Sequence, residues 1–312
     1  MTGLAIDAEL VAEEPAAELA IEVRGLTMRY HQREVLKGVD FEVRRGEVFC
    51  LLGPNGAGKT TTNEILEGFR SRTGGHVSVL GLDPGAQSTR LRERVGIVLQ
   101  ECGFPRQARV AELIDCWRSY YPKPRPLDEL LAVVELTSDK NSLVRKLSGG
   151  QRRRLDFALA LAGDPDLIFL DEPTTGYDPE SRRRCWAAIE NLRDLGKTIF
   201  LTTHYLDEAE RLADRVAILI GGRIAVNGTV RDVARQAGVA TKITFGCDNA
   251  LTPPGGVRLG GMAVCETGNA SKTLRELLDW AGTNGVGDLD DLSVAAPTLE
   301  DAYLRLVKEQ SC

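Results

Sequence analysis

The most restrictive feature of the sequence is the short run Gly53–Thr60, which follows the apolar stretch Val48–Leu52 and opens a helical pattern over Thr60–Phe69. The run matches G-x-x-x-x-G-K-[ST], the motif of phosphate-binding loops. Its glycines let backbone N–H groups curl around phosphates, and the start of a helix adds partial positive charge. A strand, this loop and a helix in that order therefore predict an α/β fold that binds a nucleotide where the strand ends.

Length and composition allow a large core, because the chain has 312 residues, of which 43% are hydrophobic and 27% charged. The longest apolar runs, such as Val216–Ile220, fall far short of the roughly 20 residues that a membrane-spanning helix needs. A formal net charge of -6 argues against a general nucleic-acid binder, which gains affinity from clustered Lys and Arg. We therefore expect a globular protein without a bilayer span and with no nucleic-acid partner.

Cysteine usage and the N-terminal charges indicate a cytoplasmic location. The 7 cysteines are scattered and include no Cys-x-x-Cys pair, as expected in a reducing compartment. Residues 1–20 carry acids and no base, whereas a secretory signal begins with a positively charged region. We interpret residues 1–20 as a mobile acidic tail.

The remaining pattern divides into two parts. Alternating strands at 21–30 and 35–43 give a β-rich start, and a helical insertion follows at about 104–162, with helices expected over 110–121 and 127–136. Helices and strands then alternate as in a parallel sheet, up to a hairpin at Gly221 and Gly222. We predict a first domain at 21–235 and a small C-terminal α+β domain at 240–312, with short strands such as 242–245 and a last helix that starts in a capping box of Thr298 and Asp301.

Two adjacent carboxylates follow the apolar strand Leu167–Leu170. At the end of such a strand Asp171 and Glu172 reach the sheet edge where open α/β sheets bind ligands, and their side chains point in opposite directions. Asp171 can support Mg²⁺ together with the Thr60 hydroxyl, while Glu172 faces an attacking water as its base. Lys59 reaches the β- and γ-phosphates. The combination predicts transfer of a nucleotide's terminal phosphoryl group to water with Mg²⁺.

A third motif, Leu147-Ser-Gly-Gly-Gln151, is a helix start with Ser148 at the cap and two glycines that expose backbone N–H groups. The phosphate loop, this signature and the Asp171-Glu172 strand, in this order, resemble the ATP-binding-cassette family over about residues 21–230. The resemblance implies a P-loop NTPase core of the ABC type with an antiparallel β subdomain, a helical insertion and a small C-terminal domain. It also implies nucleotide contacts from Gly53, Pro54, Asn55, Gly56, Ala57, Gly58, Lys59, Thr60, Thr61, Ser148, Gly149, Gly150 and Gln151.

Four further residues acquire roles through this resemblance alone. Tyr30 is similar to the aromatic residue that stacks on adenine, and Gln100 to the glutamine that contacts Mg²⁺ or water. His204 is similar to the histidine that contacts the γ-phosphate. Asp178 resembles the loop aspartate that crosses to the opposite subunit, although Tyr177 stands where a leucine is commoner, which leaves the packing of this loop open.

The same resemblance implies partners. One copy of each motif predicts a homodimer, or a heterodimer with a similar subunit, that sandwiches two ATP molecules. The C-terminal run Pro297–Asp301 resembles the tail of daunorubicin-resistance-type export ATPases, which implies a separate membrane permease, a position on the cytoplasmic face of the membrane, and export of a drug-like, lipid-like or glycan substrate. The alternatives are a soluble cassette ATPase that acts on the ribosome or DNA, and a P-loop kinase, which would not explain the signature or His204.

Overall fold

The computed structural model describes residues 18–98, 103, 105–247, 252–284 and 288–310. Its central element is a six-stranded sheet with the order β5-β6-β7-β3-β8-β9, in which all neighbours are parallel except the β8–β9 hairpin. The hairpin turns at Gly221 and Gly222, both at positive φ as a two-glycine turn predicts. The strands are β3 (Val48–Leu52), β5 (Val95–Val98), β6 (Leu167–Asp171), β7 (Thr198–Thr203), β8 (Arg215–Ile220) and β9 (Arg223–Gly228).

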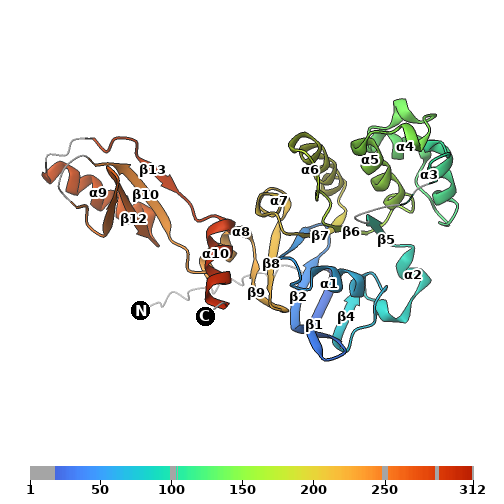
Figure 1. The fold of residues 1–312 in the computed structure, drawn as a ribbon, viewed down its shortest axis with the longest axis horizontal. Helices are drawn as coiled ribbons and strands as arrows, with labels where there is room; N and C mark the ends of the chain where they lie inside the picture. Colours follow the sequence, from blue (N-terminus) through green and yellow to red (C-terminus); the bar gives the residue numbers. More distant parts are fainter. Residues whose placement is uncertain (1–17, 99–102, 104, 248–251, 285–287, 311–312) are drawn as a thin grey trace, which may run out of the picture.

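The central sheet lies between a group of helices and a second sheet (Figure 1), and it separates two hydrophobic cores. Alternate strand residues point to opposite faces, so Cys50 and Leu52 join one core while Phe49 and Leu51 join the other. Both faces of β3 are fully buried, which explains its unbroken apolar sequence. Because both faces of the sheet are covered, we expect a ligand to bind at the edge where the strands end.

An antiparallel sheet of order β2-β1-β4 covers one face, and helix α1 packs between it and the central sheet. Phe41 of β2 stacks on Phe49 of β3 with ring centroids 5.4 Å apart, which ties the two sheets together. The strands are β1 (Leu19–Tyr30), β2 (Arg33–Arg44) and β4 (Gly74–Val79). The predicted antiparallel β subdomain is confirmed.

Helices cover the opposite face. The core there includes side chains of α3 to α8, and α3, α4 and α5 form the predicted helical insertion. The helices are α1 (Lys59–Leu66), α2 (Thr89–Arg92), α3 (Val110–Arg118), α4 (Leu127–Val133), α5 (Gly149–Ala160), α6 (Pro179–Asp194), α7 (Leu206–Leu212) and α8 (Val230–Gln236), with 3₁₀ turns at Pro84–Ala86, Thr137–Asp139 and Val144–Lys146.

Three predicted helices are shorter than their apolar patterns. The helix expected over 60–69 ends at Leu66 because Gly68 has a positive φ of 80° and its N–H turns back to the carbonyl of Ile65. The helix expected over 127–136 ends at Val133, next to Glu135 at φ 54°. The helix expected over 110–121 ends at Arg118, where Trp117 and Arg118 accept turn hydrogen bonds from Tyr120 and Tyr121. Backbone turns end these helices, although apolar side chains continue.

The C-terminal part contains a second antiparallel sheet of order β11-β12-β10-β13, with α9 packed on β10. The expectation of short strands is confirmed for β10, while α8 and α9 have no counterpart in the sequence prediction. Helix α10 packs against α7 and α8, and Leu299 and Ala302 join the core of the ATPase part. The elements are β10 (Thr241–Gly246), β11 (Gly256–Leu259), β12 (Met262–Thr267), α9 (Ala270–Asn284), β13 (Ser293–Ala295) and α10 (Leu299–Gln310).

The chain thus enters the second sheet and returns, so residues 240–312 do not form one separate hydrophobic core. The capping box predicted at Thr298 and Asp301 is present, and Lys242 of β10 pairs with Asp301 at 3.1 Å. The domain boundaries at 235 and 240 remain a prediction. The predicted acidic tail at 1–20 lies almost entirely outside the described residues. In the part of the chain that is described, no helix combines the length and the apolar character needed to span a bilayer.

Candidate ATP site

The phosphate loop connects β3 to α1 and is shaped by its glycines. Gly56 and Gly58 have positive φ values of 79° and 113°, which L side chains rarely adopt. A Cβ on Gly53 would lie 2.4 Å from the carbonyl oxygen of Leu219 on β8, and one on Gly58 would lie 2.6 Å from Leu36. Only glycine therefore allows this loop to sit against the sheet with its backbone curled.

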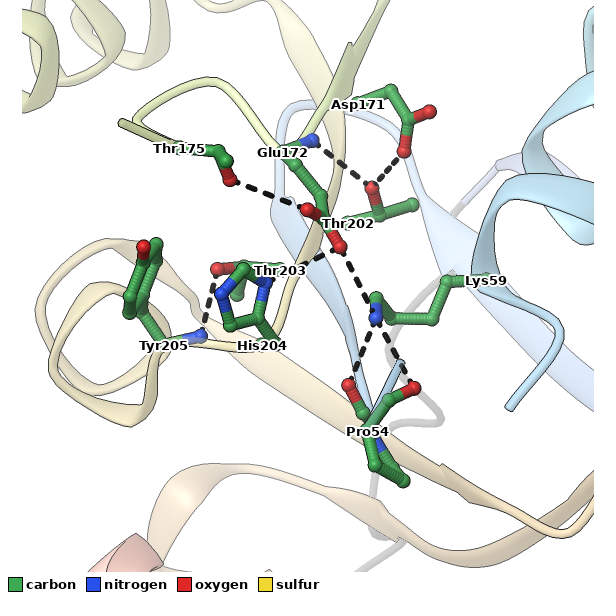
Figure 2. Close-up of polar contacts among 10 residues, drawn as sticks. Pro54, Lys59, Asp171, Glu172, Thr175, Thr202, Thr203, His204 and Tyr205 are labelled. Carbon is green, nitrogen blue, oxygen red and sulfur yellow. Dashed lines mark hydrogen bonds and ion pairs between the residues drawn. The ribbon is translucent and has the colours of Figure 1, made fainter. Parts of the chain in front are cut away.

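Lys59 occupies the first position of α1 and is 4% exposed. Its Nζ donates to the carbonyl oxygens of Gly53 (2.9 Å) and Pro54 (3.3 Å) and lies 3.2 Å from Oε1 of Glu172 (Figure 2). The ammonium group is held inside the curve of the loop, at the N-terminus of a helix. This is the position from which it can contact phosphate oxygens.

Glu172 is the point at which three distant segments meet. Its Oε1 lies 3.2 Å from Lys59 Nζ and 3.3 Å from Nδ1 of His204, and its Oε2 accepts a hydrogen bond from Thr175 (Figure 2). Its backbone has a positive φ of 44°, an uncommon conformation for a non-glycine residue that directs the side chain into the site. The structure brings together Lys59, Glu172 and His204, which lie far apart in the sequence.

Opposing effects act on the acidity of Glu172. Burial would raise the pKa of its carboxyl, but the hydrogen bonds and charges of Lys59 and His204 outweigh burial and lower the pKa. The group is therefore ionised at neutral pH. An ionised, well-positioned carboxylate is what general-base catalysis requires.

Asp171 ends β6 and points away from Glu172 toward Thr202 of β7, whose hydroxyl donates to its Oδ1 (Figure 2). Burial raises the pKa of Asp171, the Thr202 hydrogen bond opposes this shift, and the charge of Glu172 adds to it. A bound cation would stabilise the ionised form of Asp171. Thr202 was not identified from the sequence, although its place at the end of a strand next to β6 is a usable signal.

The side chains suit Mg²⁺, which takes oxygen ligands and binds through one or two carboxylates plus substrate phosphates. The Asp171 carboxylate and the exposed Thr60 residue at the start of α1 supply oxygen atoms of the right kind. The described residues contain no group of three or more His, Cys, Asp and Glu side chains suited to a metal ion. This donor set fits a metal shared with a nucleotide.

Glu67 carries a second carboxyl group that the charge of Asp171 affects, and it was not identified from the sequence. Burial raises the pKa of Glu67 to about 8, with further contributions from the charges of Asp171 and Glu64, while Asn63 donates a hydrogen bond at 2.9 Å that lowers it. Glu67 follows the last residue of α1, so the phosphate-loop helix carries a carboxyl group that keeps its proton at neutral pH.

Replacing Glu67 with glutamine should stabilise the protein more at alkaline than at acidic pH. The native carboxyl keeps a proton that the unfolded chain, with a usual pKa of 4.5, releases, so the native state loses stability as pH rises from 4.5 to about 8. The advantage of the glutamine variant should grow by about 1–4 kcal/mol over this window. Urea unfolding at several pH values measures it; the exposed Glu300→Gln is the control, and a pH-independent advantage would contradict the assignment.

The signature residues lie at the start of α5, in a different part of the fold. Ser148 caps this helix by accepting from the N–H of Gln151, whose side chain accepts from the N–H of Ser148. Ser148 and Gly149 are exposed, and a Cβ on Gly149 or Gly150 would meet open space. The α5 helix packs against α3, α4, α6 and β5. The glycines here leave a helix N-terminus accessible, and among the described residues no hydrogen bond or ion pair joins Ser148–Gln151 to the phosphate loop.

Asp178 caps α6 by accepting from the backbone N–H groups of Glu180 and Ser181, each at 3.0 Å, and the hydroxyl of Ser181 lowers its pKa. Asp178 therefore stabilises the start of α6, independently of any contact with a second subunit. Tyr177 is half-buried against the helical core, and burial raises its pKa to about 12. The tyrosine is thus accommodated in the position where a leucine is commoner.

The last two residues predicted for the site are Tyr30 and Gln100. Tyr30 ends β1 with its hydroxyl 3.4 Å from that of Thr61 on α1, so an aromatic ring lies beside the phosphate-loop helix. Gln100 lies outside the described residues.

The fold and the site define a P-loop ATPase. The sequence profile described as "ABC transporter" matches residues 36–175. The Nod factor export ATP-binding protein I of Ralstonia nicotianae is 35% identical over 92% of this chain and 93% of its own length. The daunorubicin resistance ATP-binding protein DrrA3 of Streptomyces coeruleorubidus is 33% identical over 93% and 96%. The chain belongs to the ABC transporter family and is an ATP-binding, ATP-hydrolysing subunit.

Further similarities agree on this fold. A Nod factor export ATP-binding protein I from Neorhizobium galegae is 40% identical over 70% of this chain, and the match spans 64% of that protein. A solved ATP-binding subunit of an ABC transporter has a TM-score of 0.63 at 29% identity and covers 70% of this chain and 93% of its own. A dimeric ATP-binding cassette bound to ADP and phosphate has a TM-score of 0.59 at 24% identity, over 68% and 99%, and shows the fold alone. The alternatives that act on the ribosome or DNA are not favoured.

Proposed function

We propose that this chain hydrolyses MgATP in a dimer of ATPase subunits and so drives export through a separate membrane permease. The observation that carries the proposal is the contact of Lys59 and His204 with one oxygen of Glu172. A base, a phosphate-binding cation and a γ-phosphate contact meet within hydrogen-bonding reach, as phosphoryl transfer to water requires.

Each residue has a distinct part in this mechanism. The backbone N–H groups of Gly53–Lys59 and the Lys59 ammonium bind the phosphates. Glu172 orients the attacking water and accepts its proton, and His204 contacts the γ-phosphate. Asp171 and Thr60 would hold Mg²⁺, which neutralises charge that develops on the phosphates. Tyr30 would provide a surface on which adenine stacks, and Gln100 would contact the metal or water.

The position of the signature supports the proposed dimer. The N-terminus of α5 offers exposed N–H groups to an anion, but its packing places it in the helical insertion rather than beside the phosphate loop of its own chain. A second copy in head-to-tail orientation would bring Ser148, Gly149, Gly150 and Gln151 to the other subunit's ATP. A solved cassette with the same fold is dimeric, which supports a dimer here. Asp178, at an exposed helix cap, would face the same interface.

The permease has a suitable docking surface on this chain. A groove of about 320 Å³ lies between the end of α1, β5, α3 and α5, and its lining includes Phe69, Ile97, Trp117 and the carboxyl-bearing Glu67. Phe69 is 69% exposed and Trp117 38%, which is unusual for large apolar side chains. Because Glu67 lies at the end of the phosphate-loop helix, an occupant of this groove would touch the element that binds ATP. We assign the groove to a cytoplasmic segment of the permease.

Replacing Trp117 with glutamate should abolish co-purification of the permease while leaving ATP binding by the isolated chain unchanged. A charge in a desolvated aromatic contact typically costs more than about 2 kcal/mol of binding free energy. Affinity purification from membranes, with identification of co-purifying permeases by mass spectrometry, measures the effect. Leu195→Glu, at an exposed apolar position beyond α6, is the matched control. Equal recovery of the permease with both variants would remove the groove from the docking surface.

The relatives support export as the direction, and we propose that the chain lies on the cytoplasmic face of the membrane. The two that match nearly the whole chain are named for Nod factor export and for daunorubicin resistance. Their similarity extends through the C-terminal part of this chain, not only through the ATPase core. We infer a drug-like, lipid-like or glycan cargo. Transport assays in vesicles containing the identified permease test this inference, and ATP-dependent uptake into the cytoplasmic side would contradict it.

A further inference from the structure

A cation covers one face of the Tyr30 ring. The guanidinium carbon of Arg70 lies 5.0 Å from the ring centroid, within the range of a cation–π contact. Arg70 reaches this position because the chain turns sharply after α1: the N–H groups of Phe69 and Arg70 both donate to the carbonyl oxygen of Glu64, at 2.9 and 3.0 Å. The turn therefore returns the arginine to the side of α1 that faces Tyr30.

The guanidinium is itself fixed. Glu64 on α1 forms an ion pair with Nε of Arg70, and this hydrogen bond raises the pKa of Arg70 above its usual value. At its edge the Tyr30 ring is held by the contact of its hydroxyl with Thr61, at 3.4 Å. Both contacts of the ring depend on α1, the helix that carries Lys59. Thr61 lies on this helix, and Glu64 on the same helix holds Arg70. The orientation of the ring is thus coupled to the helix that binds the phosphates.

We propose that Arg70 is a positioning residue for the adenine base, and the proposal rests on the function assigned above to Tyr30. The guanidinium backs one face of the ring and leaves the other for the base, so that arginine, tyrosine and adenine form a stack. Glu64 holds the arginine in place. A ring that is fixed before the nucleotide arrives loses less conformational freedom when the base binds. Arg70 thus increases affinity for the base without contacting the phosphates.

The test compares MgATP with magnesium tripolyphosphate, which has the phosphates but no base, as ligands of the purified full-length chain. Arg70→Ala should weaken binding of MgATP about two- to fivefold, the size of a partly exposed cation–π contact, and leave tripolyphosphate binding unchanged. Arg72→Ala is the matched control, because Arg72 pairs with Asp83 instead. Glu64→Gln, which releases the guanidinium, should act in the same direction, and it replaces Arg70→Ala if that variant does not fold.

A double-mutant cycle with Tyr30→Ala separates a positioning role from a structural one. Arg70→Ala should have no further effect on MgATP binding once the ring is absent. Additive losses, equal losses for both ligands, unchanged affinity or tighter binding of MgATP would each overturn the proposal. If Tyr30→Ala itself left the preference for MgATP over tripolyphosphate intact, the assignment of Tyr30 as the adenine platform would fail as well. A loss with Tyr30→Ala and none with Arg70→Ala would overturn the role of Arg70 alone.

Discussion

Replacing Glu172 with glutamine should lower the rate of ATP hydrolysis at least about a hundredfold and leave ATP binding intact, because general bases typically contribute 10²–10⁴-fold. The amide keeps the shape of the side chain but cannot accept the proton of the attacking water. It also removes the negative charge that lies 3.2 Å from Lys59, so the ammonium stays available to the phosphates. Phosphate release and calorimetric ATP titration measure the two effects separately.

The same variant should accumulate as an ATP-bound dimer, because ATP hydrolysis, which allows the two subunits to separate, is slow. Light scattering with ATP and Mg²⁺ should show twice the monomer mass. The control is Glu180→Gln, a glutamate on the exposed surface of α6 that should leave both turnover and mass unchanged. Native turnover by Glu172→Gln would exclude this residue as the base.

Replacing Lys59 with alanine should abolish measurable hydrolysis and weaken ATP binding at least about tenfold, because a charge-assisted contact to phosphate is lost. The chain should remain folded, since the Glu172 carboxylate keeps its contacts with His204 and Thr175. ATP titration and thermal unfolding separate loss of binding from loss of structure. Lys308→Ala, on the exposed side of α10, is the control. A folded variant with native turnover would show that Lys59 lies outside the working site.

Local motifs predicted the phosphate loop and the caps well, because their geometry is fixed by neighbouring residues. Gly56 and Gly58 at positive φ, and Ser148 with Gln151 in a capping box, are properties of a few consecutive residues. The buried strands were also predictable, since β3 is apolar throughout when both faces of a sheet are covered. The spatial meeting of Lys59, Glu172 and His204 came only from the family resemblance, because spacing along the chain does not encode it.

Long-range contacts account for what the sequence did not predict. Burial raises the pKa of Glu67, and the charge of Asp171, which lies far along the chain on β6, adds to this shift; the ring of Tyr30 faces Arg70 only because a turn follows α1. Helix α9 was missed because the glycine-rich stretches around it suggested loops and short strands, although Leu277 and Ala281 pack in a small core of their own. The return of α10 to the ATPase core is likewise a tertiary contact between distant segments.

The composite ATP site is the central claim, and complementation between two inactive chains tests it most directly. Ser148→Arg blocks the signature and Lys59→Ala damages the phosphate loop, so each homodimer has two defective sites. A mixed dimer has one site with both lesions and one site with an intact phosphate loop and an intact signature. We predict that ATPase activity returns in purified mixed dimers assembled with the permease. Full activity of Ser148→Arg alone in the assembled transporter would contradict the claim, because the signature would then not contact the nucleotide.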